Sequence, residues 1–444
     1  MSTDVGLASK RPASEQAATG DRVLLAAGAA VAVVAAITYI VAVATHPMAV
    51  TLKGFDLSVY LGGAGQALHD PGNLYTWIYQ GHPGIQFTYT PFAALLFVLG
   101  RAVPFRALMG LVAVVSVYAL LAAIWIAFRE LGWRPVARAG LTLLVGGLTL
   151  WTEPVQRGLY LGQIELAAMG LIVWDMCQPD RRWWKGAVTG IVAGIDLIPA
   201  LYIGYLLITR RFRQAFVATG AFAVTVIIGF AALPHPSVWW WLDGNFFQAG
   251  RTGFVGDQQN QSLRGMMTRL IGSVSGGQDP WLAVAVVVAV LGLVAAAVLH
   301  NSGWTFAGLM TVALTTLLVS PISWDHHWVW IAPGLALLVD AAVRAARGSL
   351  ARAWWYALAG AVLVAYAAWP DFWSKSAGLL QGGLINYAPA SYFAYGDNPS
   401  FAEYHWHGVA LIAGNLYVLG GIGLFLVALA TAARVARRSA GHAS

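Results

Sequence analysis

The sequence predicts an all-α polytopic membrane protein, and two observations lead to that prediction. Of the 444 residues, 59% are hydrophobic and only 10% are charged, whereas soluble proteins carry about 25% charged residues. Apolar runs close to the length of a membrane-spanning helix, about 20 residues, recur from one end of the chain to the other. We therefore expect one membrane domain, residues 23–435, flanked by a disordered cytoplasmic tail at 1–22 and a cytoplasmic tail at 436–444.

About ten apolar runs predict full membrane spans. They lie at 23–45, 107–128, 136–151, 158–176, 214–233, 281–299, 303–320, 328–346, 353–369 and 408–433. The first run ends without a small-residue cleavage site, which indicates a retained helix and not a signal peptide. An even number of crossings places both termini on one side.

Two further stretches predict incomplete spans. Residues 186–211 have basic residues at the C-terminal end and an apolar stretch interrupted at Asp196 and Pro199. This pattern predicts a pair of half-helices that fold back on themselves, because irregular backbone at membrane depth is tolerated where protein encloses it. Residues 90–105 are short and bounded by prolines, which predicts an interfacial or half-inserted helix. The total is about twelve helices.

The chain has more basic residues, 26 Lys and Arg, than acidic ones, 19 Asp and Glu. We interpret this excess as an indication of membrane topology. Under the positive-inside rule the basic clusters face the cytoplasm, so we expect no nucleic-acid partner. The clusters are Arg129/Arg134/Arg138, Arg181/Arg182/Lys185, Arg210/Arg211/Arg213, Arg344/Arg347/Arg352 and Arg434/Arg437/Arg438. The single cysteine, Cys177, excludes an internal disulfide and a cysteine metal cluster.

The loops on the opposite side are rich in Trp, Tyr, Asn, Gln and His. The main ones are 46–90, 234–280 and 370–407. Aromatic belts at the membrane surface account for part of this composition, and a sugar-binding surface is the second interpretation.

The stretch "GFDLSVYLGGAGQAL" places Asp56 shortly after the first span. One interpretation is an interfacial carboxylate that caps a helix. The other is a general base, because a carboxylate among apolar neighbours at the membrane boundary can keep a pKa suited to proton abstraction near neutral pH.

The stretch "SPISWDHHWVW" places Asp325, His326 and His327 at the outer end of a span. Adjacent histidines point in different directions on a helix, so this pair alone does not predict a metal site. The alternatives are a polar cap in an aromatic belt, or an imidazole near a phosphate or a catalytic carboxylate with Asp325 fixing its tautomer. No HExxH, GxSxG or glycine-rich phosphate loop occurs in the sequence.

Other polar residues lie within or beside apolar runs. Glu153, Arg157, Gln163 and Glu165 in "WTEPVQRGLYLGQIEL" either snorkel to the interface or face a cavity. Asp196 at membrane depth must be protonated, paired or hydrated.

The loop sequence "NQSLRG" holds several groups that could bind a ligand. Arg264 is either solvated or a clamp for a phosphate. Asn260 and Gln261 offer amides, and with Ser262 they match the glycosylation sequon, which is a weak signal here.

These motifs, with "FTYTPFAALLF" and "GIDLIPALYIGYLLITRRFR", occur in an order that resembles actinobacterial glycosyltransferase family 87 over residues 23–435. The resemblance implies the GT-C membrane architecture and a hexosyltransferase. No ligand cluster in the sequence requires a metal, and we expect no cofactor. The resemblance further implies polyprenol-phosphate-mannose as the donor, a phosphatidylinositol mannoside or lipoglycan as the acceptor, and an active site on the outer side of the plasma membrane.

The resemblance also implies roles for residues. Asp56 would be the general base, with His326 and His327 close to the reacting groups. Residues expected to bind donor or acceptor are Tyr60, Tyr89, Glu153, Arg157, Gln163, Glu165, Asp196, Asn260, Gln261, Arg264, Trp324 and Asp325. Family members usually have lysine at the position of Asp196 and "TYPPF" in place of "TYTPF". If that lysine binds the donor phosphate, Arg264 or a histidine must supply more of the positive charge in this chain.

Two other functions remain open from the sequence. An arabinofuranosyltransferase that uses polyprenol-phosphate-arabinose would share the motifs. A lipid-linked sugar transporter or flippase would show inverted repeats, which the sequence does not show, and would not require Asp56.

Overall fold

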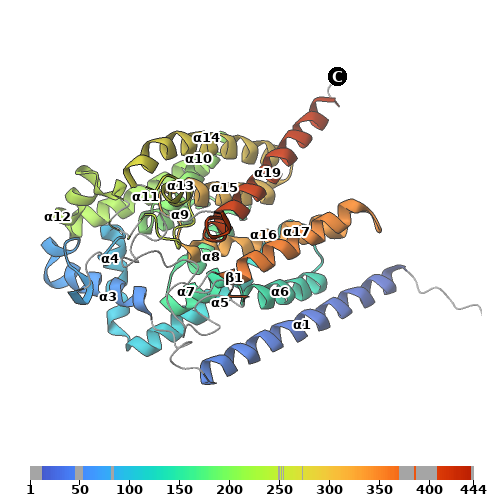
Figure 1. Cartoon of the computed structure of the whole chain (residues 1–444), viewed down its shortest axis with the longest axis horizontal. Helices are drawn as coiled ribbons and strands as arrows, with labels where there is room; N and C mark the ends of the chain where they lie inside the picture. The colour runs from blue at the N-terminus through green and yellow to red at the C-terminus, as the bar shows by residue number, and fades with distance from the viewer. Residues whose placement is uncertain are drawn as a thin grey trace, which may run out of the picture.

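The structure, a computed structural model, describes residues 13–45, 54–81, 85–248, 251, 253, 255–272, 274–369, 385–386 and 408–441. These residues are almost entirely helical (Figure 1). The expected loop at 370–407, the start of the loop at 46–90 and residues 1–12 of the expected N-terminal tail lie largely or wholly outside the described residues. The rest of that tail is helical, because α1 begins at Ala13.

Within the described residues, seven helices, counting η8 and α16 as one, are long and apolar enough to cross a membrane. They are α1 (Ala13–Thr45), α5 (Phe105–Glu130), α11 (Phe212–Ala232), α14 (Val274–Asn301), η8 with α16 (Asp325–Trp330 and Ile331–Arg344), α17 (Leu350–Ala367) and α19 (Leu416–Gly441).

Shorter elements complete the chain. The helices are α3 (Phe55–His69), α4 (Pro91–Val98), α6 (Pro135–Thr149), α7 (Glu153–Leu161), α8 (Glu165–Met176), α9 (Ala187–Ile195), α10 (Leu201–Ile208), α12 (Pro234–Ser237), α13 (Leu263–Ile271), α15 (Thr305–Val319) and α18 (Gly408–Ala413). Single turns are η1 (Pro71–Asn73), η2 (Tyr79–Gly81), η3 (Leu99–Ala102), η4 (Ile198–Ala200), η5 (Val238–Leu242) and η6 (Asn245–Phe247). Two short strands, β1 (Ala368–Trp369) and β2 (Ile385–Asn386), pair in parallel.

The predicted number of about ten full spans is not confirmed, since the described part of the chain holds seven, or eight if a bent pair counts as one. The run expected at 158–176 is broken, because α7 and α8 meet at an angle of 115°. α6 and α15 have 15 residues each. A helix of that length extends about 22 Å, which is less than the hydrocarbon thickness of about 30 Å.

The predicted hairpin of half-helices is supported by the packing of α9 and α10 on α11. A Cβ atom at Gly186 would meet the carbonyl of Gln214, and one at Gly194 would meet Thr225, so α9 runs parallel to α11. α10 ends four residues before α11 begins and therefore runs back toward its start. The break falls at Asp196, whose backbone is extended after the end of α9, as the sequence predicts.

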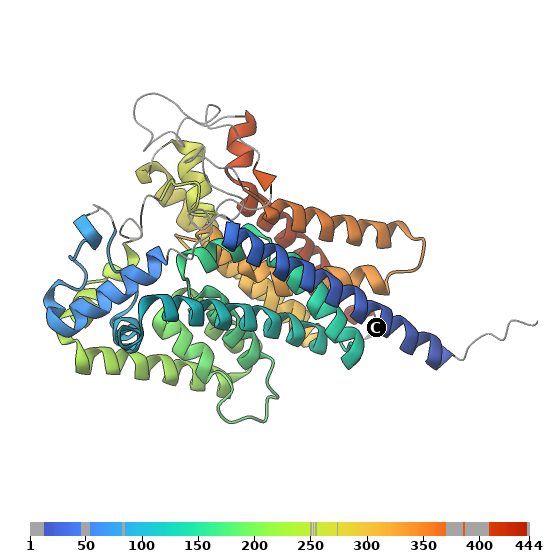
Figure 2. The ribbon, with the colours of Figure 1, turned by 90° about the horizontal axis from the view of Figure 1, so that it is seen from below.

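The long helices run roughly along the longest axis of the molecule (Figures 1 and 2), and four of the basic clusters meet at one end. Arg129 donates to the carbonyl of Cys177 at 2.9 Å, and Arg344 donates to that of Leu131 at 2.6 Å. Asp180 accepts from Arg211 at 2.7 Å and from Lys185 at 2.8 Å. We call this the basic end.

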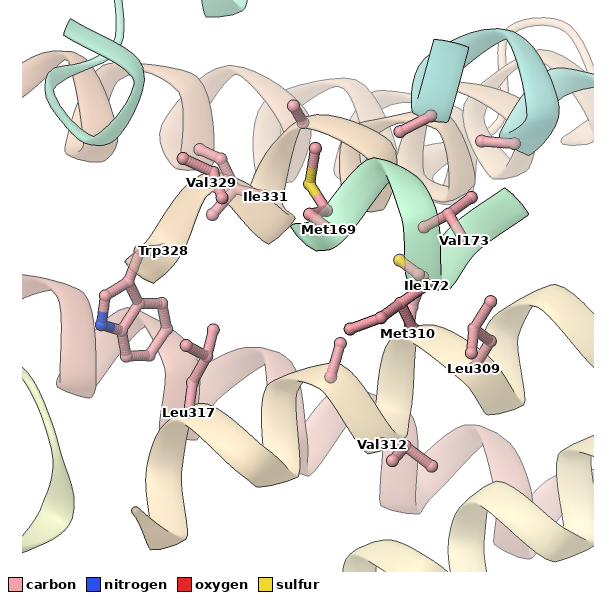
Figure 3. Packing of buried hydrophobic residues seen from close by; sticks show 14 of the residues in the cluster. Met169, Ile172, Val173, Leu309, Met310, Val312, Leu317, Trp328, Val329 and Ile331 are labelled. Atoms are coloured by element: carbon pink, nitrogen blue, oxygen red, sulfur yellow. The ribbon is translucent and has the colours of Figure 1, made fainter. Parts of the chain in front are cut away.

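The core lies where α8, α15 and the η8–α16 segment pack together (Figure 3). Met169, Val312 and Trp328 are at most 1% exposed. In a membrane, helices associate through close packing and hydrogen bonds, because lipid tails are as apolar as the side chains. α1 packs on α6 in this manner, since a Cβ at Gly28 would lie 2.1 Å from the carbonyl oxygen of Gly140.

Candidate active site

Asp56 lies in the first turn of α3, where the positive end of the helix dipole favours a carboxylate. The amide of Gly54, just before the helix, donates to the carbonyl of Tyr160 in α7 at 3.0 Å, which ties the start of α3 to the end of α7. Oδ2 of Asp56 accepts a hydrogen bond from the side-chain amide of Gln163. Burial raises the pKa of the Asp56 carboxyl, and the positive charges of His326 and Arg157 oppose this effect.

The turn between α7 and α8 carries Gln163 to Asp56. Gly162 ends α7 with φ of 74°, a conformation that glycine adopts at little cost. A Cβ there would lie 2.8 Å from Sδ of Met109 and 2.9 Å from Cβ of Leu57, so α3, α5 and α7 converge on this glycine. The break that shortens the expected span therefore positions a site residue.

A hydrogen-bonded chain runs from Asp56 across to α8. The hydroxyl of Tyr60 donates to Oε1 of Gln163 and lies 3.1 Å from that of Tyr89, which in turn donates to Oε1 of Glu165 at 3.2 Å. Burial raises the pKa of both phenols well above the usual value, so they remain protonated donors. This chain brings together Asp56 and four of the residues expected to bind donor or acceptor.

A second group of charges lies beside the first. Nε of Arg157 is 3.9 Å from Oδ2 of Asp325, and Oδ1 of Asp325 is 3.0 Å from Nδ1 of His326. Glu153, fully buried, accepts from the hydroxyl of Tyr417 at 3.0 Å. Buried charges are costly unless they are paired, and here one guanidinium balances several carboxylates.

His326 and His327 have nearly perpendicular rings with centroids 4.8 Å apart, which agrees with the expectation that adjacent histidines point in different directions. Nε2 of His327 is 3.8 Å from Oε1 of Glu165 on α8. The fold thus supplies a third side chain that the local sequence does not place there.

A small pocket lined by Glu165 and His327 opens beside the histidine pair. Asp196 at the break after α9 also lines it, with Tyr202 and Trp330. Oδ1 of Asp196 accepts from the amide of Ile198 at 3.3 Å. Asp196 therefore lies at the site, where sequence analysis expected it.

The side chains of Asn260 and Gln261, which lie just before α13, bond to backbone groups. The side chain of Asn260 bonds to the carbonyls of Val255 and Pro321 and to the amide of Ser323, and its backbone forms a bridge with Trp324. In the same way, Gln261 accepts from the amides at the start of α19 and donates to the carbonyl of Gly414. The side-chain amides of Asn260 and Gln261 are thus both occupied by backbone groups.

Arg264 stacks on Trp281 at 5.1 Å from the ring centroid. It is 6% exposed, and its Nε has no hydrogen-bond partner among the described residues. No ion pair of Arg264 with the Asp56 or Asp325 groups occurs in the described part of the chain.

Sequence analysis missed two residues at the site. Asp257 interacts electrostatically with Asp325 and Arg157, and burial raises the pKa of its carboxyl. It lies three residues before the start of "NQSLRG", so its position in the polar loop was the available signal. Tyr417 comes from α19, and nothing in its sequence surroundings indicates that it contacts Glu153.

Comparisons with known proteins support the family that the sequence motifs indicate. The profile described as "Glycosyltransferase family 87" matches residues 87–321, more than half of the chain. This range contains Gln163 and Glu165 but neither Asp56 nor the histidine pair. No solved structure is significantly similar.

The curated relatives are mycobacterial. A protein of Mycobacterium tuberculosis (strain CDC 1551 / Oshkosh) is 33% identical over 67% of this chain and 69% of its own length. One of Mycolicibacterium smegmatis is 32% identical over 68% and 74%. Both are named polyprenol-phosphate-mannose-dependent alpha-(1-2)-phosphatidylinositol pentamannoside mannosyltransferase. A third, from Mycobacterium tuberculosis (strain ATCC 25618 / H37Rv), is 30% identical over 63% and 65% and is named as the corresponding phosphatidylinositol mannoside mannosyltransferase.

Proposed function

Because the chain belongs to glycosyltransferase family 87, we propose that this membrane glycosyltransferase moves mannose from polyprenol-phosphate-mannose to a phosphatidylinositol mannoside or related lipoglycan. The product would carry an α-1,2 linkage. The names of the mycobacterial relatives support this donor and acceptor. The reaction would occur on the outer face of the plasma membrane, in contact with the bilayer.

The observation that carries the proposal is the environment of Asp56. This partly buried carboxylate is oriented by the amide of Gln163 and lies near Arg157 and His326. A glycosyl transfer from a phosphate needs a base for the incoming hydroxyl and positive or hydrogen-bonding groups for the leaving phosphate. Both kinds of group meet here.

In the proposed mechanism, Asp56 accepts the proton of the acceptor hydroxyl while the hydroxyl oxygen forms a bond to C1 of the donor sugar. The bond between C1 and the phosphate oxygen breaks, and the phosphate leaves with the electron pair. One displacement inverts the anomeric centre, so a β-linked donor gives an α product. Arg157 and His326 would stabilise the negative charge that develops on the phosphate.

The first experiment compares membranes that contain wild type, Asp56→Asn or Asp70→Asn. Asp70 ends the same helix and is exposed, so it is the matched control. With radiolabelled polyprenol-phosphate-mannose and a phosphatidylinositol mannoside, Asp56→Asn should lose about 100-fold or more in rate, the contribution typical of general acid–base catalysis. Asp70→Asn should match wild type.

Three outcomes would redirect the assignment. A wild type that transfers arabinose and not mannose would show the arabinofuranosyltransferase alternative. An Asp56→Asn variant as active as wild type would refute the base, and a wild type that moves intact lipid-linked sugar across vesicles without transfer would indicate a flippase.

A further inference from the structure

The geometry points to a divalent metal site formed by Glu165, His326 and His327. One potential ligand atom from each side chain lies within 4.8 Å of the other two. Sequence analysis expects no metal because two adjacent histidines cannot form a site alone. The fold changes this situation by placing a carboxylate from α8 next to the histidines of η8.

Buried polar atoms without partners support the inference. Oε2 of Glu165, Nε2 of His326 and Nδ1 of His327 are buried and have no hydrogen-bond partner among the described residues. His326 is only 4% exposed. Leaving such atoms unpaired is unfavourable, and metal coordination would remove part of that penalty.

The side chain behind His326 also fits a metal ligand. Asp325 occupies Nδ1 of His326 at 3.0 Å, which leaves Nε2 as the free nitrogen. Histidines that bind metals usually have their other ring nitrogen bonded to a carboxylate or carbonyl, which fixes the tautomer and the orientation of the ring. Asp325 would therefore be a positioning residue for the metal.

The charge around the site favours a cation. The carboxylates of Asp56, Asp196 and Asp325 lie at or beside the site. On one side of the site, the guanidinium of Arg157 pairs with Asp325. On the side of the pocket, Glu165 and Asp196 line the wall together. A phosphate that entered this pocket would meet two carboxylates unless a cation lay between them.

The ligand set indicates the class of metal. Two imidazoles and one carboxylate suit zinc and other divalent first-row ions and leave positions open, as in catalytic zinc sites. Bonds of about 2.1 Å hold tetrahedral ligands roughly 3.4 Å apart. Binding would therefore draw the three side chains together by up to about 1.4 Å from their separation here.

The role of the metal rests on the proposed function, whereas its binding does not. Glu165 and His327 both line the pocket, so an open coordination position would face it. There the ion would hold an oxygen of the donor phosphate and offset the negative wall, which a metal can do as a Lewis acid.

The test is cobalt binding to the full-length protein, purified in detergent and stripped with a chelator. Cobalt is the probe because its visible absorption reports coordination, and elemental analysis after gel filtration gives the stoichiometry. We expect one cobalt ion per chain, displaced by zinc. His326→Gln and His327→Gln should each weaken binding by at least about tenfold, and Asp325→Asn by about 10- to 100-fold. His300→Gln, at a partly buried histidine bonded to Tyr205 outside the site, is the control and should bind as wild type does.

Gel filtration and melting temperature identify variants that fail to fold, and these are replaced by Glu165→Gln. No bound cobalt in the wild type, or binding that is unchanged in both histidine variants, overturns the inference. The mannosyl-transfer assay is scored separately. Cobalt binding without any transfer would leave the metal site in place and remove only the proposed role at the phosphate.

Discussion

At the scale of single residues, Gln163 joins the turn between α7 and α8 to α3. Its amide nitrogen donates to Asp56, and its oxygen accepts from Tyr60. Because both ends of the side chain are engaged, Gln163 can hold the proposed base in one orientation. Orientation of this kind lowers the barrier of a reaction without changing how tightly the substrate binds.

Replacing Gln163 with Leu should therefore reduce kcat more than it raises KM. A hydrogen bond to a charged group contributes about 1.5–3 kcal/mol, which corresponds to a loss in kcat of about 10- to 100-fold. Steady-state kinetics on purified protein measures the change. Gln178→Leu is the matched control, since Gln178 is bonded to the carbonyl of Trp174 at the basic end. An equal loss in both variants would contradict the role of Gln163.

The raised pKa of Asp56 predicts a pH dependence. A general base works when it is deprotonated, so kcat/KM should rise with pH through this pKa. The acidic limb should lie above about pH 4, where ordinary aspartates titrate. The residual activity of Asp56→Asn should lack this limb, and a limb that persists in the variant would assign it to another group.

The raised pKa of Asp56 also affects the free energy of unfolding, with a pH dependence opposite to that of activity. The folded state binds the proton of Asp56 more tightly than the unfolded chain does. The contribution of Asp56 to the free energy of unfolding therefore falls as the pH rises from the unfolded pKa to the folded pKa. The pH at which Asp56 favours activity is thus the pH at which it disfavours folding.

At the scale of helices, the break between α7 and α8 organises the site. It turns the chain by 115°, directs Gln163 toward α3 and places Glu165 at the start of α8. A straight helix through this segment would separate these residues from Asp56. Because of the break, α7 is a short helix that depends on packing against neighbouring helices for its stability.

Gly162→Ala should disrupt this arrangement. Alanine is strained at φ of 74°, and its Cβ would collide with Met109 and Leu57. We expect a loss of about 1–3 kcal/mol in stability, measured as a lower melting temperature in detergent, together with lower transferase activity. Gly360→Ala is the control, because nothing lies within 4 Å of a Cβ at that helical position, and it should leave stability unchanged or raise it by up to about 1 kcal/mol. A Gly162→Ala variant as stable as wild type would show that the close contacts relax.

At the scale of the whole molecule, the site and the basic end lie at opposite ends of the same helices. α5 begins near Gly54 and Gly162 and has Arg129 in its last turn, and the η8–α16 segment begins at Asp325 and ends at Arg344. Because basic residues remain on the cytoplasmic side, this arrangement supports a site on the outer face.

Labelling with a membrane-impermeant maleimide in intact cells tests this topology. Cys177 is the single cysteine and is first replaced by alanine. Gly72→Cys, at an exposed position after α3, should be labelled from outside. Trp183→Cys, 77% exposed at the basic end, should be labelled only after the cells are permeabilised. The reverse pattern would place the site on the cytoplasmic side.

The sequence by itself determined the helical class, the interruption at Asp196 and the local motifs around Asp56, Gln163 and the histidine pair. Hydropathy and helix-breaking residues act over a few neighbouring positions, so these features can be predicted from short segments. The family also follows from the order of the motifs, as the comparisons show.

Only the tertiary structure decided which of these groups meet. Glu165 lies next to His327, Tyr417 reaches Glu153 from the last helix, and the amides of Asn260 and Gln261 hold backbone. The predicted number of spans is not confirmed among the described residues, because an apolar run does not reveal a bend of its backbone. The physical reason is that side chains distant in sequence are brought together by helix packing, which hydropathy along the chain does not encode.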